Sequence, residues 1–523
     1  LRCNTSGCFN TALGAAALNS NVSGDQSTAI GFSALRLNTA GGNTAVGYNS
    51  LCCNTSGTAN VAVGSSTLMK VATTTRNVAI GQSVLACNVG SCNTGLGHSA
   101  LTANQGGSSN VAIGACALDA NTTADNNVAV GTFSLSANTT GYINVSAGRN
   151  SMCDNTSGQG NVAIGGNSLC DNTTGSTNIA IGCSAMAGNL TCGTNIGIGF
   201  CALFTNNGAN NNAVGNQVLK FNTTGYQNTA MGTFAGRSNT EGFANTVYGY
   251  NAMVTNQVGN NNVAMGANAL CANTTAGYQT AVGTNALKTA AGAGGFNTAI
   301  GYDAGTAVTS GDYNVLAGNN AGGFVTTGTE NVLLGNGAGA NTTNITTGIK
   351  NVMIGSYNRG ASADSANSVV IGYDVDGVNN AMTIGNGATD SRIAFGATSI
   401  TAPSDQRLKE EIIDSTAGLD FINDLRPVTY KWKQEKDIPE TMKGFVQDSI
   451  KRFKNEKVNH GFIAQEVKEA IDNHSELKDG FDMWQEETET VGKRQRLAEG
   501  ALIPMLVKAI QELTAKIKVL EDK

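Results

Sequence analysis

The first four hundred residues are distinguished by what they lack. No proline occurs before Pro403, and residues 1–403 hold only 24 of the 68 charged side chains. Residues 404–523 hold the other 44, together with the remaining three prolines and both tryptophans. The chain therefore consists of two physically different segments that join near residue 403.

Charge excess and long apolar runs are missing from the whole chain. The net charge of the 523 residues is only -6 at pH 7, without a long basic or acidic run, so nucleic acid is not an expected partner. No apolar stretch approaches the length that spans a bilayer, and we expect no membrane insertion. The opening LRCNTSG has neither a methionine nor an apolar signal segment, which is the pattern of a fragment of a longer protein.

Metal-binding cysteine patterns are also missing. The 13 cysteines all lie at or before Cys271, and none forms a CxxC pair. Their odd number favours small apolar side chains in a packed column, with disulfides as the alternative. We therefore expect neither a metal site nor a cofactor.

What the first segment has instead is a repeat. The motif Asn-[Thr/Val]-Ala-[Ile/Val]-Gly recurs with a step that is almost always 17 residues, sometimes 16 or 18. The repeat is regular over residues 1–340, whereas residues 341–403 hold degenerate repeats and a linker. The aligned glycines are Gly14, Gly31, Gly47, Gly64, Gly81, Gly97, Gly114, Gly131, Gly148, Gly165, Gly182, Gly199, Gly215, Gly232, Gly249, Gly266, Gly283, Gly301, Gly318 and Gly335, followed by Gly355, Gly372 and Gly385.

One repeat predicts one coil of a parallel β-solenoid or β-roll. Its Asn-Val-Ala-Ile-Gly motif alternates with period two, so Val162 and Ile164 point one way and Ala163 the other. A second short strand at 167–169 and the turn-forming NTTG at 172–175 complete a coil of two strands and two turns. Stacked coils bury the apolar face that one coil cannot bury alone. The fold class is therefore mainly β, with asparagine and threonine ladders along the shaft.

Two cysteines fall in register on consecutive coils. Cys153 and Cys170 each lie five residues after their aligned glycine. We expect their side chains to stack at a distance that permits a disulfide without requiring one.

Alanine and glycine dominate the Ala163 side of the strand. A smooth face of small residues suits close packing between chains, and a homotrimer would bury it. A monomeric solenoid with alanine in its core is the alternative. The repeats resemble those of trimeric autotransporter adhesin heads and of many phage tail fibres, although the adhesin repeat is shorter.

The stretch TAPSDQRLKEEI, residues 401–412, begins the second segment. By its residues alone, Pro403 ends the repeats and Ser404 or Asp405 caps a helix that starts at QRLKEEI. A final helix carries apolar residues at alternating spacings of three and four, which predicts a short coiled coil. These residues are Ile503, Leu506, Ile510, Leu513, Ile517 and Leu520.

Four ordered motifs in residues 404–523 resemble a known family. They are Ser-Asp-x-Arg-Leu-Lys at 404–409, LDFINDLRPVTYKWK at 419–433, HGFIAQEVKEAI at 460–471 and LIPMLVKAIQELTAKIKVLE at 502–521. Together they resemble the intramolecular chaperone auto-processing domain of endosialidase-type peptidases, which ends phage tailspikes and many tail fibres. The resemblance implies a small α+β domain that assists trimerisation of the preceding fibre.

The resemblance also implies self-cleavage at the Pro403–Ser404 bond, with Ser404 as nucleophile and Lys409 as its base. A serine hydroxyl needs a base, and a lysine can serve where burial or nearby positive charge keeps it neutral. His460 has the alternative reading of a histidine that caps or precedes a helix, and His98 and His474 have no partner pattern. The possible supporting residues are Asp405, Arg407, His460 and Gln465.

The implied function is a receptor-binding viral tail-fibre segment on the virion, with self-cleavage as its one enzymatic activity and no external substrate. Its expected partners are two further copies of itself and a host receptor or glycan. A bacterial adhesin of the trimeric autotransporter type is the alternative, but residues 404–523 are charged and helical rather than a barrel anchor. A polysaccharide-cleaving tailspike would need paired carboxylates, and Asp374 and Asp376 are isolated.

Overall fold

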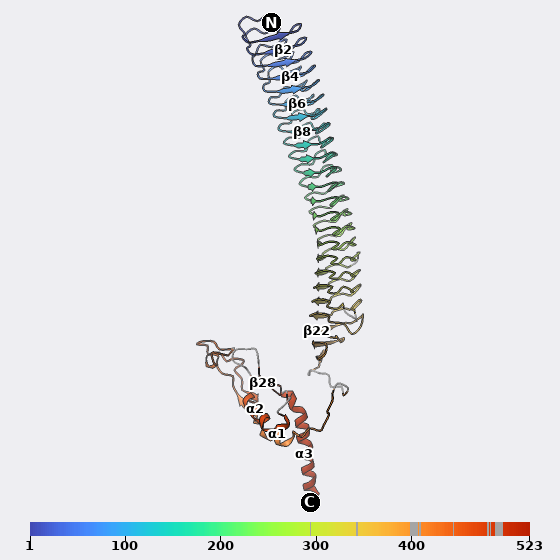
Figure 1. Ribbon diagram of the computed structural model, residues 1–523, viewed down its shortest axis with the longest axis vertical. Helices are drawn as coiled ribbons and strands as arrows, with labels where there is room; N and C mark the ends of the chain where they lie inside the picture. The colour runs from blue at the N-terminus through green and yellow to red at the C-terminus, as the bar shows by residue number, and fades with distance from the viewer. Residues whose placement is uncertain are drawn as a thin grey trace. The chain divides into compact units, whose positions relative to one another are not determined.

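The computed structural model describes residues 1–523 apart from 293, 341–343, 398–405, 407–408, 443, 478–480, 482, 487–494 and 523. The chain divides into two compact units, Leu1–Pro403 and Ser404–Lys523. Figure 1 shows stacked coils in the first unit and a small set of helices and hairpins in the second.

The first unit is a β-solenoid. In the described part of the chain, 24 strands form one sheet, in which each strand from β1 to β22 pairs in parallel with the next. Strand β24 pairs antiparallel with β23 and ends the stack. The predicted mainly-β solenoid is therefore confirmed.

The strands of the first unit are β1 (Thr11–Leu13), β2 (Thr28–Ile30), β3 (Thr44–Val46), β4 (Val61–Val63), β5 (Val78–Ile80), β6 (Thr94–Leu96), β7 (Val111–Ile113), β8 (Val128–Val130), β9 (Val145–Ala147), β10 (Val162–Ile164), β11 (Ile179–Ile181), β12 (Ile196–Ile198), β13 (Asn212–Val214), β14 (Thr229–Met231), β15 (Thr246–Tyr248), β16 (Val263–Met265), β17 (Thr280–Val282), β18 (Thr298–Ile300), β19 (Val315–Ala317), β20 (Val332–Leu334), β21 (Val352–Ile354), β22 (Ser368–Gly372), β23 (Ala381–Gly385) and β24 (Asp390–Ala394).

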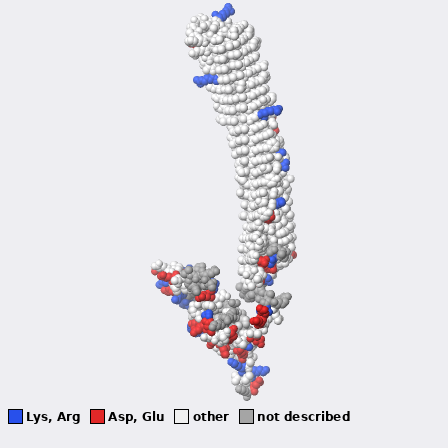
Figure 2. Space-filling view, in the orientation of Figure 1, with Lys and Arg blue, Asp and Glu red and all other residues white. Residues whose placement is uncertain are grey.

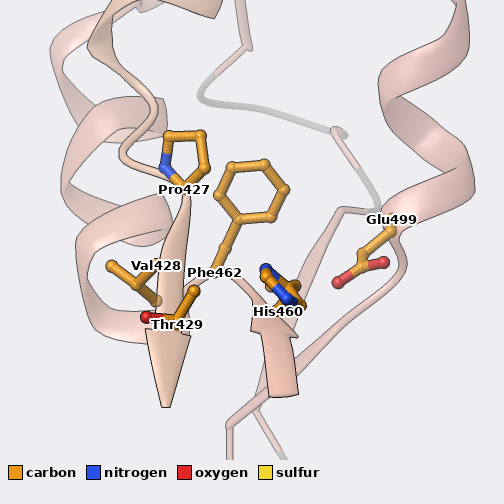
Figure 3. A pocket seen from close by; sticks show the side chains of 7 residues that line it. Pro427, Val428, Thr429, His460, Phe462 and Glu499 are labelled. Carbon is orange, nitrogen blue, oxygen red and sulfur yellow. The ribbon is translucent and has the colours of Figure 1, made fainter. Parts of the chain in front are cut away.

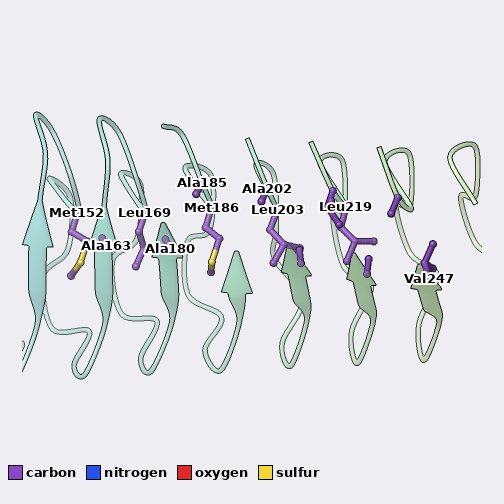
Figure 4. Close-up of a cluster of buried hydrophobic side chains, with 14 of the residues drawn as sticks. Met152, Ala163, Leu169, Ala180, Ala185, Met186, Ala202, Leu203, Leu219 and Val247 are labelled. Atoms are coloured by element: carbon purple, nitrogen blue, oxygen red, sulfur yellow. The ribbon is translucent and has the colours of Figure 1, made fainter. Parts of the chain in front are cut away.

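The alanine of each strand faces the core of its own solenoid. Ala163, Leu169 and Met186 are 0% exposed, and Figure 4 shows such alanines and leucines stacked inside successive coils. Ile164, the next residue after Ala163, is 42% exposed. The expectation that the alanine face meets another chain is therefore wrong, and the alternative of an alanine-filled core is correct. The outward face of the strands is valine, isoleucine and threonine.

The second strand expected in each coil is a turn instead. Asn167 has φ 54° and Leu169 has φ 50°, a left-handed conformation that is uncommon for residues other than glycine. Burial of the leucine side chain, worth about 1.5–3 kcal/mol, and the hydrogen bond from the Leu169 N–H to the Ala185 oxygen at 2.9 Å offset its cost. A tight turn, and not a second strand, therefore directs the Leu169 side chain into the core.

The aligned glycine is required by contact between coils. Gly165 has φ +129°, and a Cβ at this position would lie 2.5 Å from the Gly182 oxygen of the next coil. No L-residue adopts this backbone at low cost, and no side-chain carbon fits. The glycine column is therefore a steric requirement of the stacking distance.

Buried asparagines form ladders along the shaft. The Asn172 amide donates to Asn155 Oδ1 at 2.7 Å and to the Gly175 oxygen at 3.0 Å. In a second column, the Asn178 N–H donates to Asn161 Oδ1 at 2.9 Å. The Asn172 amide thus pairs with its own turn and with a side chain of the neighbouring coil. In the second column the side-chain oxygen accepts a backbone N–H of the next coil, so both columns provide the partners that buried polar groups require.

The described elements of the second unit are α1 (Leu419–Asp424), β25 (Val428–Tyr430), η2 (Glu435–Asp437), β26 (Asn459–Gly461), α2 (Ala464–Asn473), η3 (Ser475–Leu477), β27 (Trp484–Glu486), β28 (Gln495–Leu497), η4 (Glu499–Leu502) and α3 (Ile503–Glu521). Strands β25 and β26 form one antiparallel hairpin pair, and β27 and β28 form another. Phe421 of α1 is 0% exposed at the centre of the core.

Helix α3 packs on α1 and caps it. The Leu419 N–H donates to Glu512 Oε2 at 2.9 Å. A Cβ on Gly418 would lie 2.7 Å from the same carboxylate. The helix start thus receives its negatively charged partner from the far end of the domain, because Gly418 itself offers no capping side chain.

The helix expected from QRLKEEI does not form over the described residues. Residues 409–417 are not helical, and Glu411 has φ +53°. A left-handed residue cannot continue a right-handed helix, so the expected helix over this segment is wrong.

Within the described ranges, no helix combines the length and the apolar character needed to cross a membrane.

Candidate functional site

Most of the predicted cleavage site, including Ser404 of the dyad, lies outside the described residues. Pro403, Ser404, Asp405 and Arg407 are among the residues that the structure does not describe. Lys409 is described and exposed, and its N–H donates to the Gln406 oxygen at 3.1 Å. The pairing of Ser404 with Lys409 therefore stays a prediction.

His460 lies in a strand and not at a helix cap. It occupies the middle of β26, opposite Thr429 of β25, and the N-cap of α2 is Ile463. The Arg-Pro strand motif and the His-Gly-Phe motif therefore meet as two halves of one hairpin. Gln465, in the first turn of α2, is exposed.

His460 lines a pocket of about 470 Å³ beside this hairpin. In Figure 3 the His460 ring, the Glu499 carboxylate and the Phe462 ring surround the same space. Neither Lys409 nor Gln465 lines it. The lining residues are Pro427, Val428, Thr429, His460, Gly461, Phe462 and Glu499.

The pocket brings together one imidazole, one carboxylate and one hydroxyl. His460 is exposed, and its two ring nitrogens can donate or accept hydrogen bonds. Glu499 comes from η4, which leads directly into α3, so its position depends on the closing helix. This chemistry is suited to proton transfer or to hydrogen bonding of a polar chain segment.

His474 was missed by sequence reasoning but has clear partners. Its Nε2 lies 2.8 Å from Asp424 Oδ2, and its Nδ1 lies 3.4 Å from Glu476 Oε1. The hydrogen bond to Asp424 and the charge of Glu476 raise the pKa of His474. The ring also packs edge-on against Phe421 at 5.4 Å. Asp424 is fifty residues away in sequence, so of the two acidic partners only the nearby Glu476 could have been suggested by the sequence.

An ion pair joins two of the sequence motifs. Arg426 Nε lies 3.0 Å from Glu466 Oε2, and a second guanidinium nitrogen contacts the other carboxylate oxygen. The Glu466 carboxylate raises the pKa of Arg426. The pair links α2 to the segment between α1 and β25.

The two isolated acids of the shaft are paired with one cation. Arg359 Nη1 lies 2.7 Å from Asp374 Oδ1, and Nε contacts Asp376. These carboxylates are held by a guanidinium instead of flanking a substrate groove as a polysaccharide-cleaving pair must. Across the described residues, no cluster of three or more His, Cys, Asp or Glu could hold a metal ion.

Three of the four sequence motifs, those at 404–409, 419–433 and 460–471, follow one another within residues 404–476 of the sequence. Residues 404–476 match the family model described as the chaperone of endosialidase. No curated protein and no solved structure matches the chain. A β-solenoid that runs into a chaperone-of-endosialidase domain fits a tail fibre or tailspike with a C-terminal trimerisation chaperone.

The closing helix lies beyond the matched residues of the chaperone-of-endosialidase domain. Leu502, at the end of η4, belongs to the same buried cluster as Phe421 and Ile471. Glu512 of α3 caps α1. The matched stretch therefore depends on η4 for part of its core and on α3 for one helix end.

Proposed function

We propose that this chain is a segment of a homotrimeric viral tail fibre that is exposed on the virion and contacts the host surface. Its C-terminal domain sets the register of three chains and then cuts the bond between Pro403 and Ser404. The observation that carries this proposal is the family match directly after a shaft of nearly interchangeable coils.

Three identical solenoids have a register problem. Every strand from β2 to β22 has the same kind of parallel neighbour on each side. If one chain slid along the shaft axis by one coil, most contacts between chains would be replaced by equivalent ones. The shaft alone therefore specifies the alignment of the three chains only weakly. A unique domain at one end supplies the alignment that the repeats lack.

Helix α3 offers a surface for contact between copies. Its heptad positions Ile503, Ile510 and Leu520 are 63%, 62% and 71% exposed, whereas Ala509, next to Ile510, is 5% exposed. The helix thus packs on its own domain with one face and leaves a continuous apolar seam on the adjoining face. Three such helices would bury the seam against one another.

The outward face of the solenoid strands is a second surface of this kind. Ile113, Ile164 and Ile300, each just before its aligned glycine, are 37%, 42% and 47% exposed. Figure 2 shows that few charged side chains interrupt the shaft. A long apolar stripe is expected to be covered in an assembly, and this stripe extends along the direction in which parallel shafts would run.

Cleavage at residue 403 would separate the two compact units at their boundary. In the proposed step, Ser404 Oγ attacks the carbonyl carbon of Pro403 and gives its proton to Lys409. Lys409 passes this proton to the Ser404 nitrogen as the carbon–nitrogen bond breaks, which leaves an ester on Ser404 Oγ. Water then hydrolyses the ester to a Pro403 carboxylate and restores the Ser404 hydroxyl. Asp405, Arg407, His460 and Gln465 are proposed to support this site. Loss of the chaperone then leaves a kinetically trapped fibre.

Substitution of the nucleophile tests the cleavage. The full chain is expected to give fragments 1–403 and 404–523 on denaturing gels. Ser404→Ala and Lys409→Ala should leave it intact. Ser415→Ala, at an exposed serine in the same segment, is the control and should cleave normally. An unchanged fragment pattern in Ser404→Ala would refute the assigned nucleophile.

A further inference from the structure

Two cysteines on consecutive coils are placed for a bond. Cys153 and Cys170 both follow their aligned glycine by five residues, and their Sγ atoms are 3.0 Å apart. The Asp154 N–H donates to the Cys170 oxygen at 3.1 Å, which keeps the coils at sheet spacing, about 4.8 Å. Disulfide-linked Cα atoms usually lie roughly 4.4–6.8 Å apart, so the spacing of the coils falls within the range that a disulfide spans.

The column around this pair contains no competing thiol. The same register position holds Ser136 on the preceding coil and Ala187 on the following coil. Both cysteines are half-buried, so a small reagent can reach them. Cys271 occupies the same register position on a later coil, next to Val254 and Lys288 instead of another cysteine. It is equally half-buried and serves as an internal reference.

The two thiols are not equivalent. The hydrogen bond from the Cys170 thiol lowers the pKa of Cys153, and the same hydrogen bond and burial raise the pKa of Cys170. Because the thiolate is the nucleophile in disulfide exchange, Cys153 is the sulfur that reacts first. Once Cys153 is capped, its negative charge no longer opposes ionisation of Cys170.

We propose that Cys153 and Cys170 form a disulfide between consecutive coils when the folded chain meets a small-molecule disulfide such as oxidised glutathione. The Cys153 thiolate attacks one sulfur of the reagent and expels a glutathione thiolate. Cys170 then loses its proton and attacks the Cys153 sulfur, which expels the second glutathione. Two protein thiols are oxidised and one reagent disulfide is reduced to two thiols.

The bond would run along the shaft axis. It closes the 17-residue loop of one coil, so two neighbouring coils can no longer peel apart while it is intact. A solenoid frays by separating neighbours, and the disulfide blocks fraying at this boundary.

Peptide mapping of the full chain tests the proposal, because the sequence places an aspartate directly after each cysteine. Cleavage before Asp125, Asp154 and Asp171 gives peptides 125–153 and 154–170, with one cysteine each. After oxidation by glutathione disulfide and alkylation, these peptides are expected to appear as one linked pair that a reductant separates. The pair should form at least about tenfold faster in the folded chain than in guanidinium chloride, because folding fixes the two sulfurs together.

Matched controls separate this pair from general thiol oxidation. Cys271 should remain alkylated when Cys153 and Cys170 are linked. Cys170→Ser should accumulate a glutathione adduct at Cys153 faster than Cys153→Ser accumulates one at Cys170. Full alkylation of both cysteines in the oxidised folded chain, or equal linking rates in the folded and unfolded chains, would overturn the proposal. Equal adduct rates in the two variants would overturn Cys153 as the attacking sulfur.

Discussion

The two units of this chain obtain order in opposite ways. In the shaft, each coil repeats one set of contacts with its neighbours, and the glycine, asparagine and alanine columns recur with the repeat. In the C-terminal unit, each contact occurs once, as in the capping of α1 by Glu512 or the pairing of His474 with Asp424.

This difference teaches where specificity resides. Repeated contacts give stability that grows with the number of coils but do not distinguish one alignment from another. Contacts that occur once define a unique arrangement but come from few residues. The chain therefore places its charges, prolines and tryptophans where a unique surface is needed, and keeps the shaft nearly free of them.

Removal of residues 404–523 is expected to have the largest effect, because it leaves the repeated contacts without the unique ones. We expect residues 1–403, expressed alone, to lose the correctly aligned trimer entirely, because the shaft cannot choose its register. Light scattering and thermal melting of the purified product measure the outcome. A thermally robust three-chain rod formed by residues 1–403 alone would contradict the proposed role of the domain, whereas the same rod obtained by cleavage after assembly would not.

The glycine column gives the next largest effect. Gly165→Ala forces φ +129° on an L-residue and sets a Cβ 2.5 Å from the Gly182 oxygen, so we expect a loss of about 3 kcal/mol or more in the free energy of unfolding. Gly166→Ala is the matched control, since its Cβ would meet no atom closer than 4.0 Å. Circular-dichroism melting of both variants makes the comparison, and similar destabilisation by the two would show that stacking distance is not the cause.

The stability of the asparagine ladder should be sensitive to the replacement of one side-chain NH2 group by an oxygen. Asn172→Asp removes the donor to Asn155 Oδ1 and to the Gly175 oxygen and buries a charge, which we expect to cost about 2–3 kcal/mol at neutral pH. The control is Asn167→Asp, at an exposed position of the same coil. Denaturant unfolding measures both, and recovery of the Asn172→Asp variant at acidic pH is expected, because the protonated acid is neutral and can donate one hydrogen bond.

The smallest expected effect is the pH dependence of the His474–Asp424 pair in the C-terminal unit. The folded-state pKa of His474 is raised, so its stabilisation is fully present below the unfolded pKa of about 6.5 and is lost as pH rises through the folded pKa. We expect less than about 1 kcal/mol from this pair, because Asp424 is half exposed.

Tryptophan fluorescence isolates this effect, since Trp432 and Trp484 both lie in the C-terminal unit. His474→Gln should flatten the decline in stability as the pH rises above about 6.5. His460→Gln, at an exposed histidine of the same unit, should retain the decline. A steeper decline in His474→Gln than in the unchanged chain would contradict the sign.

The solenoid was predictable because its signal is repeated. Period-two alternation at Val162 to Ile164 identified the strand, and the glycine spacing identified the coil. The strand faces were not predictable, because alternation does not say which side is inside. Alanine occupies the core because Leu169, delivered by a left-handed turn, already fills much of it.

The candidate site was less predictable, because its contacts join distant segments. The motifs at 419–433 and 460–471 contain β25 and α2, but the strand at His460 was not expected. The pairing of His474 with Asp424 and the capping by Glu512 depend on residues fifty or more positions apart. The expected helix after Ser404 was wrong over residues 409–417, where a left-handed Glu411 breaks it.

Each coil pairs only with the coils before and after it in the sequence, and this has a consequence for the gene that encodes the repeats. The coil that begins at Thr11 and the coil that begins at Val162 present the same backbone register to whatever follows them. Unequal recombination between two repeats would therefore excise or duplicate whole coils and leave each new junction as well matched as the old ones. The length of the shaft can thus change in single-coil steps while the C-terminal unit stays the same.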